Sequence, residues 1–144
     1  MSYQQKDRPA AILKTVIVDD DAVIRAGLRS IMESLGAEVV GEADNGRSAV
    51  ERAQSLCPEV ILLDVSMPVM GGLAAARELR SLMPELHIIL ISQHRERAYA
   101  KEALQIGVEG YVLKRAAFSE LPNAINAVIS GHTFVSPGIT RLFF

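Results

Sequence analysis

Strand-like and helix-like segments alternate five times along this chain of 144 residues. Such alternation is typical of a parallel sheet whose strands are joined by crossover helices. Four strand segments contain compact aliphatic blocks, as expected for strands covered on both faces, whereas Glu38–Ala43 carries charge near both ends and is expected at an edge. The chain should therefore form a three-layer α/β sandwich. Its predicted strands are Lys14–Val18, Glu38–Ala43, Val60–Leu63, His87–Ile91 and Gly110–Leu113.

Two intervening segments show the helical period most clearly. Steps of three and four residues gather their apolar side chains on one face, which predicts an amphipathic helix in each. Gly36 and Gly131 are expected where these helices end, and Pro122 is expected in the first turn of the last one, where a missing N–H costs little. The apolar positions are Ile24, Leu28, Ile31 and Leu35 in one segment and Phe118, Leu121, Ile125 and Val128 in the other.

Composition narrows the classes of protein to which the chain can belong. Its hydrophobic content of 49% is that of an ordinary globular domain. The apolar runs are too short to cross a bilayer and the N-terminus lacks a signal-peptide core, so we expect a soluble, cytoplasmic protein with no membrane partner. A single cysteine, Cys57, and three histidines without metal-ligand spacing argue against disulfides and zinc. With 15 Lys and Arg against 17 Asp and Glu, the chain lacks the basic surface that nucleic-acid binding requires.

Polar side chains follow four of the five predicted strands at the point where each strand ends. The carboxyl ends of parallel strands meet at one crevice, which is where such folds place their ligands. Three acidic residues follow the first strand, one follows the third, a hydroxyl follows the fourth and an ammonium follows the fifth. In chain order these residues are Asp19, Asp20, Asp21, Asp64, Ser92 and Lys114.

Each of these residues also has a purely structural interpretation. Aspartates before a helix commonly cap it, and Asp21 is expected to do only that. A serine after a strand is commonly a turn residue, and a lone lysine is commonly solvated. None of these interpretations explains why all the groups stand at corresponding strand ends, so together they favour a functional site.

The chemistry of the group points to phosphoryl transfer. Asp19, Asp20 and Asp64 in one crevice would concentrate negative charge that a fold does not keep without a counter-ion. Mg²⁺ takes carboxylates, carbonyls and water as ligands and commonly binds beside a phosphate. Lys114 would then neutralise one phosphoryl oxygen, and Ser92 would donate a hydrogen bond to another. Such a site acts by positioning and by charge neutralisation.

Four motifs at these strand ends resemble, in order, the signatures of bacterial response-regulator receiver domains. The resemblance implies a flavodoxin-like receiver fold, a doubly wound parallel sheet of strand order 2-1-3-4-5. It covers most of the chain and predicts a receiver domain over residues 14–131 after a flexible N-terminal leader, residues 1–13. The four motifs are Ile17–Asp21, Leu62–Leu73, Ile91–Ser92 and Gly110–Lys114.

The resemblance also implies a role for each residue of the site. Asp64 is the expected phosphoacceptor, which becomes an aspartyl phosphate, and Ser92 and Lys114 are expected to contact the phosphoryl group. Ser92 and Tyr111 match the pair that switches conformation in family members, although Tyr111 also fits a half-exposed aromatic residue of a strand. The implied Mg²⁺ ligands are Asp19, Asp20, Asp64 and the backbone carbonyl of Ser66.

Three positions depart from the commonest receiver pattern. Arg115 follows Lys114 where many receivers have proline, which puts a cis peptide bond there in doubt. Gly71 replaces a frequent acidic residue, and Asp21 stands where one large subfamily has histidine. None of these departures removes a chemical group that the reaction needs.

The segment Ala127–Pro137 resembles the end of receivers in NarL/FixJ-type regulators, where a linker leads to a helix-turn-helix DNA-binding domain. Residues 132–144 are therefore expected to begin a linker toward an output domain that this chain lacks. The implied partners are a sensor histidine kinase, a second copy after phosphorylation, and DNA only through that output domain. The implied function is signalling that controls transcription rather than enzymatic turnover of a substrate. A stand-alone single-domain regulator is the alternative.

Three other classes of protein fit part of the pattern. A phosphatase with an aspartate nucleophile needs a second acid two residues later, where Ser66 stands. A flavodoxin-like nucleotide binder needs a phosphate-binding loop after the first strand, where three aspartates would repel a phosphate. A degenerate receiver used only for protein contacts is disfavoured because no reactive group is missing.

Overall fold

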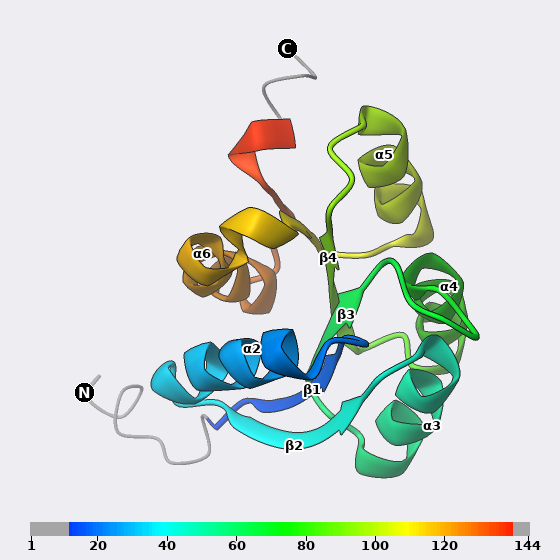
Figure 1. Cartoon of the computed structure of the whole chain (residues 1–144), viewed down its shortest axis with the longest axis vertical. Helices are drawn as coiled ribbons and strands as arrows, with labels where there is room; N and C mark the ends of the chain where they lie inside the picture. Colours follow the sequence, from blue (N-terminus) through cyan, green and yellow to red (C-terminus); the bar gives the residue numbers. More distant parts are fainter. Residues whose placement is uncertain (1–11, 140–144) are drawn as a thin grey trace.

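The computed structural model describes residues 12–139 and has three layers, with a six-stranded sheet between two layers of helices (Figure 1). Every neighbouring pair of strands is parallel, and the order is β2-β1-β3-β4-β5-β6. The predicted doubly wound α/β fold is therefore confirmed. The strands are β1 (Lys14–Val18), β2 (Glu38–Ala43), β3 (Val60–Asp64), β4 (His87–Ser92), β5 (Gly110–Leu113) and β6 (Phe134–Val135).

The sixth strand is the main difference from the predicted sheet. β2 lies at one edge as expected, but the other edge is β6 rather than β5. Backbone N–H groups of Phe134 and Ser136 donate to the carbonyls of Glu109 and Tyr111, both at 2.9 Å, and attach the segment to β5. A strand of two residues shows no alternation of apolar and polar positions, so its pairing depends on backbone geometry that the sequence does not reveal.

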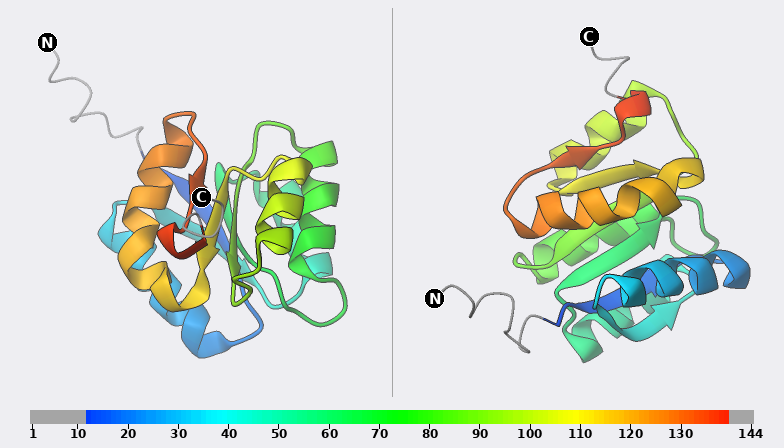
Figure 2. Two further views of the ribbon diagram at one scale, coloured as in Figure 1. Left: turned by 90° about the horizontal axis from the view of Figure 1, so that it is seen from above. Right: turned by 90° about the vertical axis from the view of Figure 1, so that its left-hand side faces the viewer.

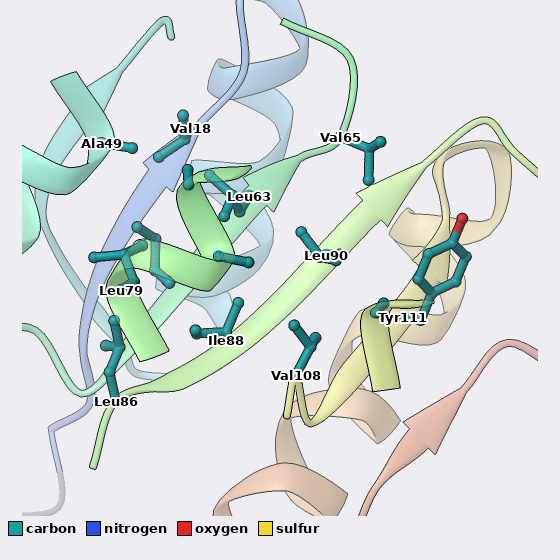
Figure 3. Close-up of a cluster of buried hydrophobic side chains, with 14 of the residues drawn as sticks. Val18, Ala49, Leu63, Val65, Leu79, Leu86, Ile88, Leu90, Val108 and Tyr111 are labelled. Atoms are coloured by element: carbon teal, nitrogen blue, oxygen red, sulfur yellow. The ribbon is translucent and has the colours of Figure 1, made fainter. Parts of the chain in front are cut away.

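Helices cover both faces of the sheet. α2 and α6 lie together on one face, and α3, α4 and α5 lie on the other (Figure 2). The buried aliphatic side chains of the strands alternate between the two resulting cores. Figure 3 shows the core under α4, where Leu79 lies near Leu63 and Ile88. The helices are α2 (Ala22–Ser34), α3 (Gly46–Leu56), α4 (Gly72–Leu82), α5 (Arg97–Ile106) and α6 (Ala117–Ile129), with a short 3-10 turn η2 (Lys114–Ala116) before the last.

The helix ends agree with the predicted signals except at Pro122. Asp21 caps α2 by accepting the backbone N–H of Val23 at 2.9 Å, and Gly36 and Gly131 adopt positive φ angles of 87° and 90° just after their helices. The placement of Pro122 in a first turn is wrong, because α6 begins at Ala117 and Pro122 lies inside the helix. The preceding turn of 3-10 helix leads the chain into α6 earlier than the proline suggested.

Both ends of the sequence carry predictions that the structure does not reach. Residues 1–11 of the predicted leader and residues 140–144 of the predicted linker lie outside the described residues. Within residues 12–139, no helix is both long and apolar enough to span a membrane.

Candidate functional site

The carboxyl ends of β1, β3 and β5 bring two aspartates and a lysine into contact. The Lys114 ammonium lies 3.0 Å from Oδ2 of Asp19 and 3.3 Å from Oδ2 of Asp64. Asp19 is fully buried and Asp64 is 2% exposed. Apart from this ammonium, neither Oδ2 atom has a hydrogen-bond partner among the described residues. Two buried carboxylates therefore share one cation.

This imbalance of charge perturbs the titration of the group. Burial raises the pKa of Asp64 to about 6, and repulsion from Asp19 acts in the same direction against the opposing attraction of Lys114. Burial alone would lower the pKa of Lys114, but its contacts with Asp19 and Asp64 outweigh that effect and raise it. Lys114 is therefore a firmly charged ammonium, and it does not fully compensate the two carboxylates.

The remaining acidic residue completes a set of oxygen donors suited to a hard cation. Asp20 is exposed, and the carboxylates of Asp19, Asp20 and Asp64 offer oxygens that lie within 4.8 Å of one another. Mg²⁺ favours carboxylate and carbonyl oxygens and retains several waters, which an open, acidic strand-end site allows. The donor set and its excess negative charge thus fit the predicted metal, and Asp21 takes no part because it caps α2.

Ser92 and Tyr111 are neighbours on the adjacent strands β4 and β5. Ser92 is fully buried, and its Oγ accepts the backbone N–H of His94 at 2.9 Å. The Tyr111 ring is also fully buried, and its hydroxyl donates to the His94 carbonyl at 3.0 Å. The ring lies inward beside Val108 and the other core side chains in Figure 3. A half-exposed position for Tyr111 is therefore wrong.

His94 is a residue of this region whose position the sequence did not reveal. Its ring stacks on Tyr99 with centroids 4.0 Å apart and planes 11° apart, and its Nε2 lies 3.5 Å from Oγ of Ser66. The backbone of His94 also joins Ser92 to Tyr111. The residues that His94 contacts come from three separate elements, and the sequence does not show that these elements meet. Its position two residues after Ser92 is the one signal in the sequence that could have indicated a role for His94.

The loop between β3 and α4 approaches the site closely. A Cβ atom on Gly72 would lie 2.2 Å from the backbone oxygen of Asp64, so only glycine allows this contact. Val69, in contrast, adopts a φ of 68°, and the N–H of Met70 donates to the carbonyl of Pro68 at 2.7 Å across it. This tight turn carries a β-branched residue in the left-handed region, which is strained.

Beside Ser92 and Lys114 the surface forms a cavity of about 130 Å³. Arg95 and Arg115 stand at its walls. The peptide bond between Lys114 and Arg115 is trans, since the described residues contain no cis peptide bond. Arginine in place of proline thus leaves Lys114 at the end of β5, in contact with both carboxylates.

A parallel α/β sheet with buried aspartates, a hydroxyl and an ammonium at its strand ends defines a class of domain suited to accept a phosphoryl group. The family model for the response regulator receiver domain matches residues 15–126, and the chain belongs to that family. Members of the family are signalling domains that are phosphorylated on an aspartate.

Curated relatives place the chain near regulators of the predicted subfamily. It is 34% identical over 131 residues to the response regulator GacA of Pseudomonas syringae pv. syringae (strain B728a), a match that covers 90% of this chain and 61% of GacA. It is 36% identical over 131 residues to the response regulator UvrY of Escherichia coli (strain K12), covering 90% of this chain and 60% of UvrY. The chain therefore spans about three-fifths of the length of these relatives.

Solved structures agree with this placement. A two-component response regulator of the LuxR family from Aurantimonas sp. SI85-9A1 superposes with a TM-score of 0.86 at 30% identity, covering 91% of this chain and 94% of that one. The receiver domain of NarL from Mycobacterium tuberculosis gives 0.77 at 35% identity, covering 84% and 98%. The isolated receiver domain of RcsB from Salmonella enterica serovar Typhimurium, with the phosphomimetic BeF₃⁻ present, gives 0.84 at 27% identity, covering 91% and 98%. The predicted NarL/FixJ-type resemblance is confirmed.

Proposed function

We propose that Asp64 accepts a phosphoryl group from a phosphohistidine of a sensor histidine kinase. The observation that carries this proposal is the buried Asp64 carboxylate, which shares the Lys114 ammonium with Asp19 at the end of the central strand β3. In the transfer, a carboxylate oxygen forms a bond to phosphorus while the phosphorus–nitrogen bond of the donor breaks. The electron pair of that bond remains on the departing imidazole, which takes up a proton.

The surrounding residues orient this reaction. In the proposed reaction Lys114, which contacts both aspartates, binds one phosphoryl oxygen, and Ser92, which lines the same cavity as Lys114, donates its hydroxyl to another. Bound Mg²⁺ would neutralise charge on the phosphoryl oxygens. Its proposed ligands are Asp19, Asp20, Asp64 and the backbone carbonyl of Ser66. The chain then acts as a signalling phosphoacceptor that promotes only its own phosphorylation and dephosphorylation.

The assignment of Asp64 can be tested by intact-mass spectrometry after incubation with acetyl phosphate and Mg²⁺. The wild type should gain one phosphoryl group, and Asp64→Asn should gain none. Asp44→Asn is the matched control, because Asp44 is an exposed acid just after β2 and outside the acidic cluster. Equal phosphorylation of Asp64→Asn and the control would exclude Asp64 as the acceptor.

The metal ligands can be tested by thermal unfolding with and without Mg²⁺. A ligand that binds only the folded state raises the melting temperature according to its concentration and affinity. Mg²⁺ should stabilise the wild type more than Asp20→Asn, while Asp20→Asn should be the more stable protein without metal because one repulsive charge is gone. Identical shifts with Mg²⁺ in both proteins would remove Asp20 from the site.

We also propose that Ser92 and Tyr111 form the switch. A phosphoryl group brings about −1.5 to −2 charge and three acceptor oxygens, and should draw the Ser92 hydroxyl away from its bond with the His94 N–H. The backbone carbonyl of the same residue, His94, accepts a hydrogen bond from the Tyr111 hydroxyl. The loop after β4 and the Tyr111 ring should therefore shift together. A bias of a few kcal/mol between two packings is sufficient.

The switch is tested by NMR with beryllofluoride, which stands in for the phosphoryl group. Resonances near Tyr111 should shift in the wild type and shift less in Ser92→Ala, while Asp64 of that variant still accepts phosphate. Equal shifts around Tyr111 in both proteins would show that the signal runs through another contact.

The output follows from the relatives. We propose that residues 14–131 form the receiver, that residues 132–144 lead toward an output domain, and that phosphorylation promotes pairing with a second copy. Two structures of one similar protein, RcsB, support this proposal: one contains two RcsB dimers bound to DNA, and the other is an RcsB–DNA complex. The proposed result is control of transcription in the cytoplasm, with DNA contacted only by the output domain. An electrophoretic shift with the full-length parent protein, phosphorylated and unphosphorylated, tests this.

A further inference from the structure

Arg25 connects the metal-binding turn to the neighbouring edge strand. It lies in the first turn of α2, is partly buried, and donates from Nη1 to the backbone carbonyl of Asp19 at 2.6 Å. Its Nε donates to Oε1 of Glu42, on β2, at 2.9 Å. One guanidinium therefore holds both the peptide after Asp19 and a carboxylate one strand away.

Glu42 is itself firmly oriented. Its second oxygen, Oε2, accepts hydrogen bonds from Nε and Nη2 of Arg29 at 2.9 and 2.7 Å. Hydrogen bonds from Arg29, and to a lesser degree from Arg25, lower the pKa of Glu42 in spite of its burial. Glu42 is therefore ionised at neutral pH, and it fixes the plane of the Arg25 guanidinium.

The carbonyl that Arg25 holds belongs to the peptide that joins Asp19 to Asp20. The same turn is tied at two other points: the N–H of Asp19 donates to the Ala43 carbonyl at 3.1 Å, and the N–H of Asp21 donates to Oδ1 of Asp19 at 2.8 Å. The bond from Arg25 acts directly on the peptide between the two acidic side chains. The orientation of that peptide decides where both carboxylates point.

We propose that Arg25 is a positioning residue for Mg²⁺, acting through the Asp19–Asp20 peptide without touching the metal. This inference rests on the proposed assignment of Asp19 and Asp20 as metal ligands. Groups that hydrogen-bond to metal ligands and orient them contribute substantially to metal affinity. A ligand that is not held in place must lose conformational freedom when the metal binds.

Charge and positioning predict opposite effects when Arg25 is removed. The positive charge of Arg25 by itself opposes the binding of a cation, so its loss would tighten Mg²⁺ binding if charge were its main contribution. Loss of the hydrogen bond to the Asp19 carbonyl frees the turn and weakens binding. The sign of the change in affinity therefore distinguishes the two roles.

Arg29 provides a matched control. It binds the same carboxylate of Glu42 from the same helix, and its other hydrogen bond is to Glu33 on that helix. Arg29→Ala removes the same charge and the same type of ion pair, but leaves the Asp19–Asp20 peptide held. It should change stability as Arg25→Ala does, without the same effect on the metal.

The test compares Mg²⁺ dissociation constants of the whole chain by calorimetry or by NMR titration. Arg25→Ala should weaken Mg²⁺ binding about tenfold, and Arg29→Ala should change it by less than about twofold. Arg25→Lys should lie between them, because a single ammonium keeps the charge but cannot hold the carbonyl and the carboxylate in the same forked geometry. If Arg25→Ala does not fold, Arg25→Lys against Arg29→Lys makes the same comparison.

A second measurement does not use the metal. Hydrogen exchange of the Asp21 amide, which donates to Asp19, should be faster in metal-free Arg25→Ala than in Arg29→Ala. Unchanged or tighter Mg²⁺ binding in folded Arg25→Ala would overturn the inference, and so would equal weakening in the two alanine variants. Failure of the wild type to bind Mg²⁺ would instead overturn the proposed metal site, before any variant is compared.

Discussion

The two ends of the sheet both bring charged side chains out of water, but they treat those charges differently. At the carboxyl ends, Asp19 and Asp64 share Lys114. At the amino ends, the Arg80 guanidinium donates to the backbone carbonyls of Pro84 and Leu86 at 2.8 Å each, and to Oε1 of Glu109 at 2.8 Å. One end has a surplus of carboxylate, whereas the other pairs a cation with several acceptors.

The amino-end cluster is close to complete. Oε1 of Glu109 also accepts the Ile88 N–H at 3.0 Å, and Oε2 lies 3.3 Å from Nδ1 of His87. Only Nε of Arg80 lacks a partner among the described residues. Paired and hydrogen-bonded charges of this kind support a fold, while an uncompensated group marks a place where a ligand or reaction supplies the missing charge.

Cavity size alone would place a binding site at the amino end of the sheet. The amino end carries a cavity of about 630 Å³ between Leu13, Pro58 and Ile129, against about 130 Å³ beside Ser92 and Lys114. The acidic residues that line the larger space, Glu59 and Glu85, are exposed to water, whereas Asp64 is buried. Charge imbalance, and not cavity volume, therefore coincides with the proposed site of phosphorylation.

The largest expected loss of stability on mutation is at the amino end. Arg80→Met should lower the free energy of unfolding by about 2–3 kcal/mol, because it leaves Glu109 and two carbonyls without their donor in a partly buried site. Urea denaturation measures the change. Arg77→Met on the same helix is the control, since Arg77 and Glu102 are both largely exposed and their pair should contribute less than about 1 kcal/mol. Equal losses in the two variants would remove the distinction between the clusters.

The carboxyl end should respond with the opposite sign. Asp64 has a folded-state pKa of about 6, above the ordinary value near 3.9 of an unfolded chain. Between roughly pH 4 and 6 the folded protein therefore binds more protons than the unfolded one, and metal-free stability falls as pH rises, by as much as about 3 kcal/mol. Asp64→Asn has no carboxylate at this position to lose a proton. Its free energy of unfolding should therefore be higher than that of the wild type above pH 6.

The measurement is the free energy of unfolding from pH 4 to 8 without divalent cations. The difference between Asp64→Asn and the wild type should be small near pH 4 and should grow through pH 6. Asp44→Asn, at an exposed position, should follow the wild type. A difference that is constant over this range would mean that the Asp64 carboxylate is not destabilised by burial and by Asp19.

The contrast between local and long-range contacts also decides what the sequence could predict. All five predicted strands are confirmed, with β3 and β4 each one residue longer than predicted, because four are short aliphatic blocks and the fifth, Glu38–Ala43, carries the end charges of an edge strand. The strand-end positions of Asp19, Asp64, Ser92 and Lys114 follow from those boundaries. Topology alone brings such groups together once the sheet is known to be parallel.

What the sequence did not predict depends on contacts between distant segments. The bond from Arg25 to the Asp19 carbonyl, the contacts of His94 and the pairing of β6 each involve backbone groups, which every residue has. Every residue has a backbone carbonyl, so the residue type does not indicate which carbonyl accepts a hydrogen bond from a distant side chain. Phe118 was also predicted on the apolar face of its helix, but it is 53% exposed. Its ring lies against Gly27 of α2 at the protein surface.

The smallest expected effect concerns backbone strain, which also differs between the two ends. Within residues 12–139, two non-glycine residues have positive φ: Cys57, at 49°, ends α3 near the amino edge, and Val69, at 68°, lies in the loop after Asp64. A left-handed residue after a helix is a common way to end it. A β-branched residue in a tight turn is more costly, and Val69 is 84% exposed, so no packing offsets the strain.

Val69→Gly should therefore raise the free energy of unfolding by roughly 0.5–1 kcal/mol, the balance between relief of about 1–2 kcal/mol of left-handed strain and the larger entropy of an unfolded glycine. Cys57→Gly should gain less, since an unbranched residue is less strained there. Urea denaturation without Mg²⁺, under reducing conditions, compares them. The functional consequence separates them further: a relaxed loop after Asp64 should slow phosphorylation by acetyl phosphate in Val69→Gly, whereas Cys57→Gly should keep the wild-type rate. If Cys57→Gly raised the free energy of unfolding more than Val69→Gly, the greater backbone strain would lie at the amino end. Strain would then not be associated with the loop after Asp64.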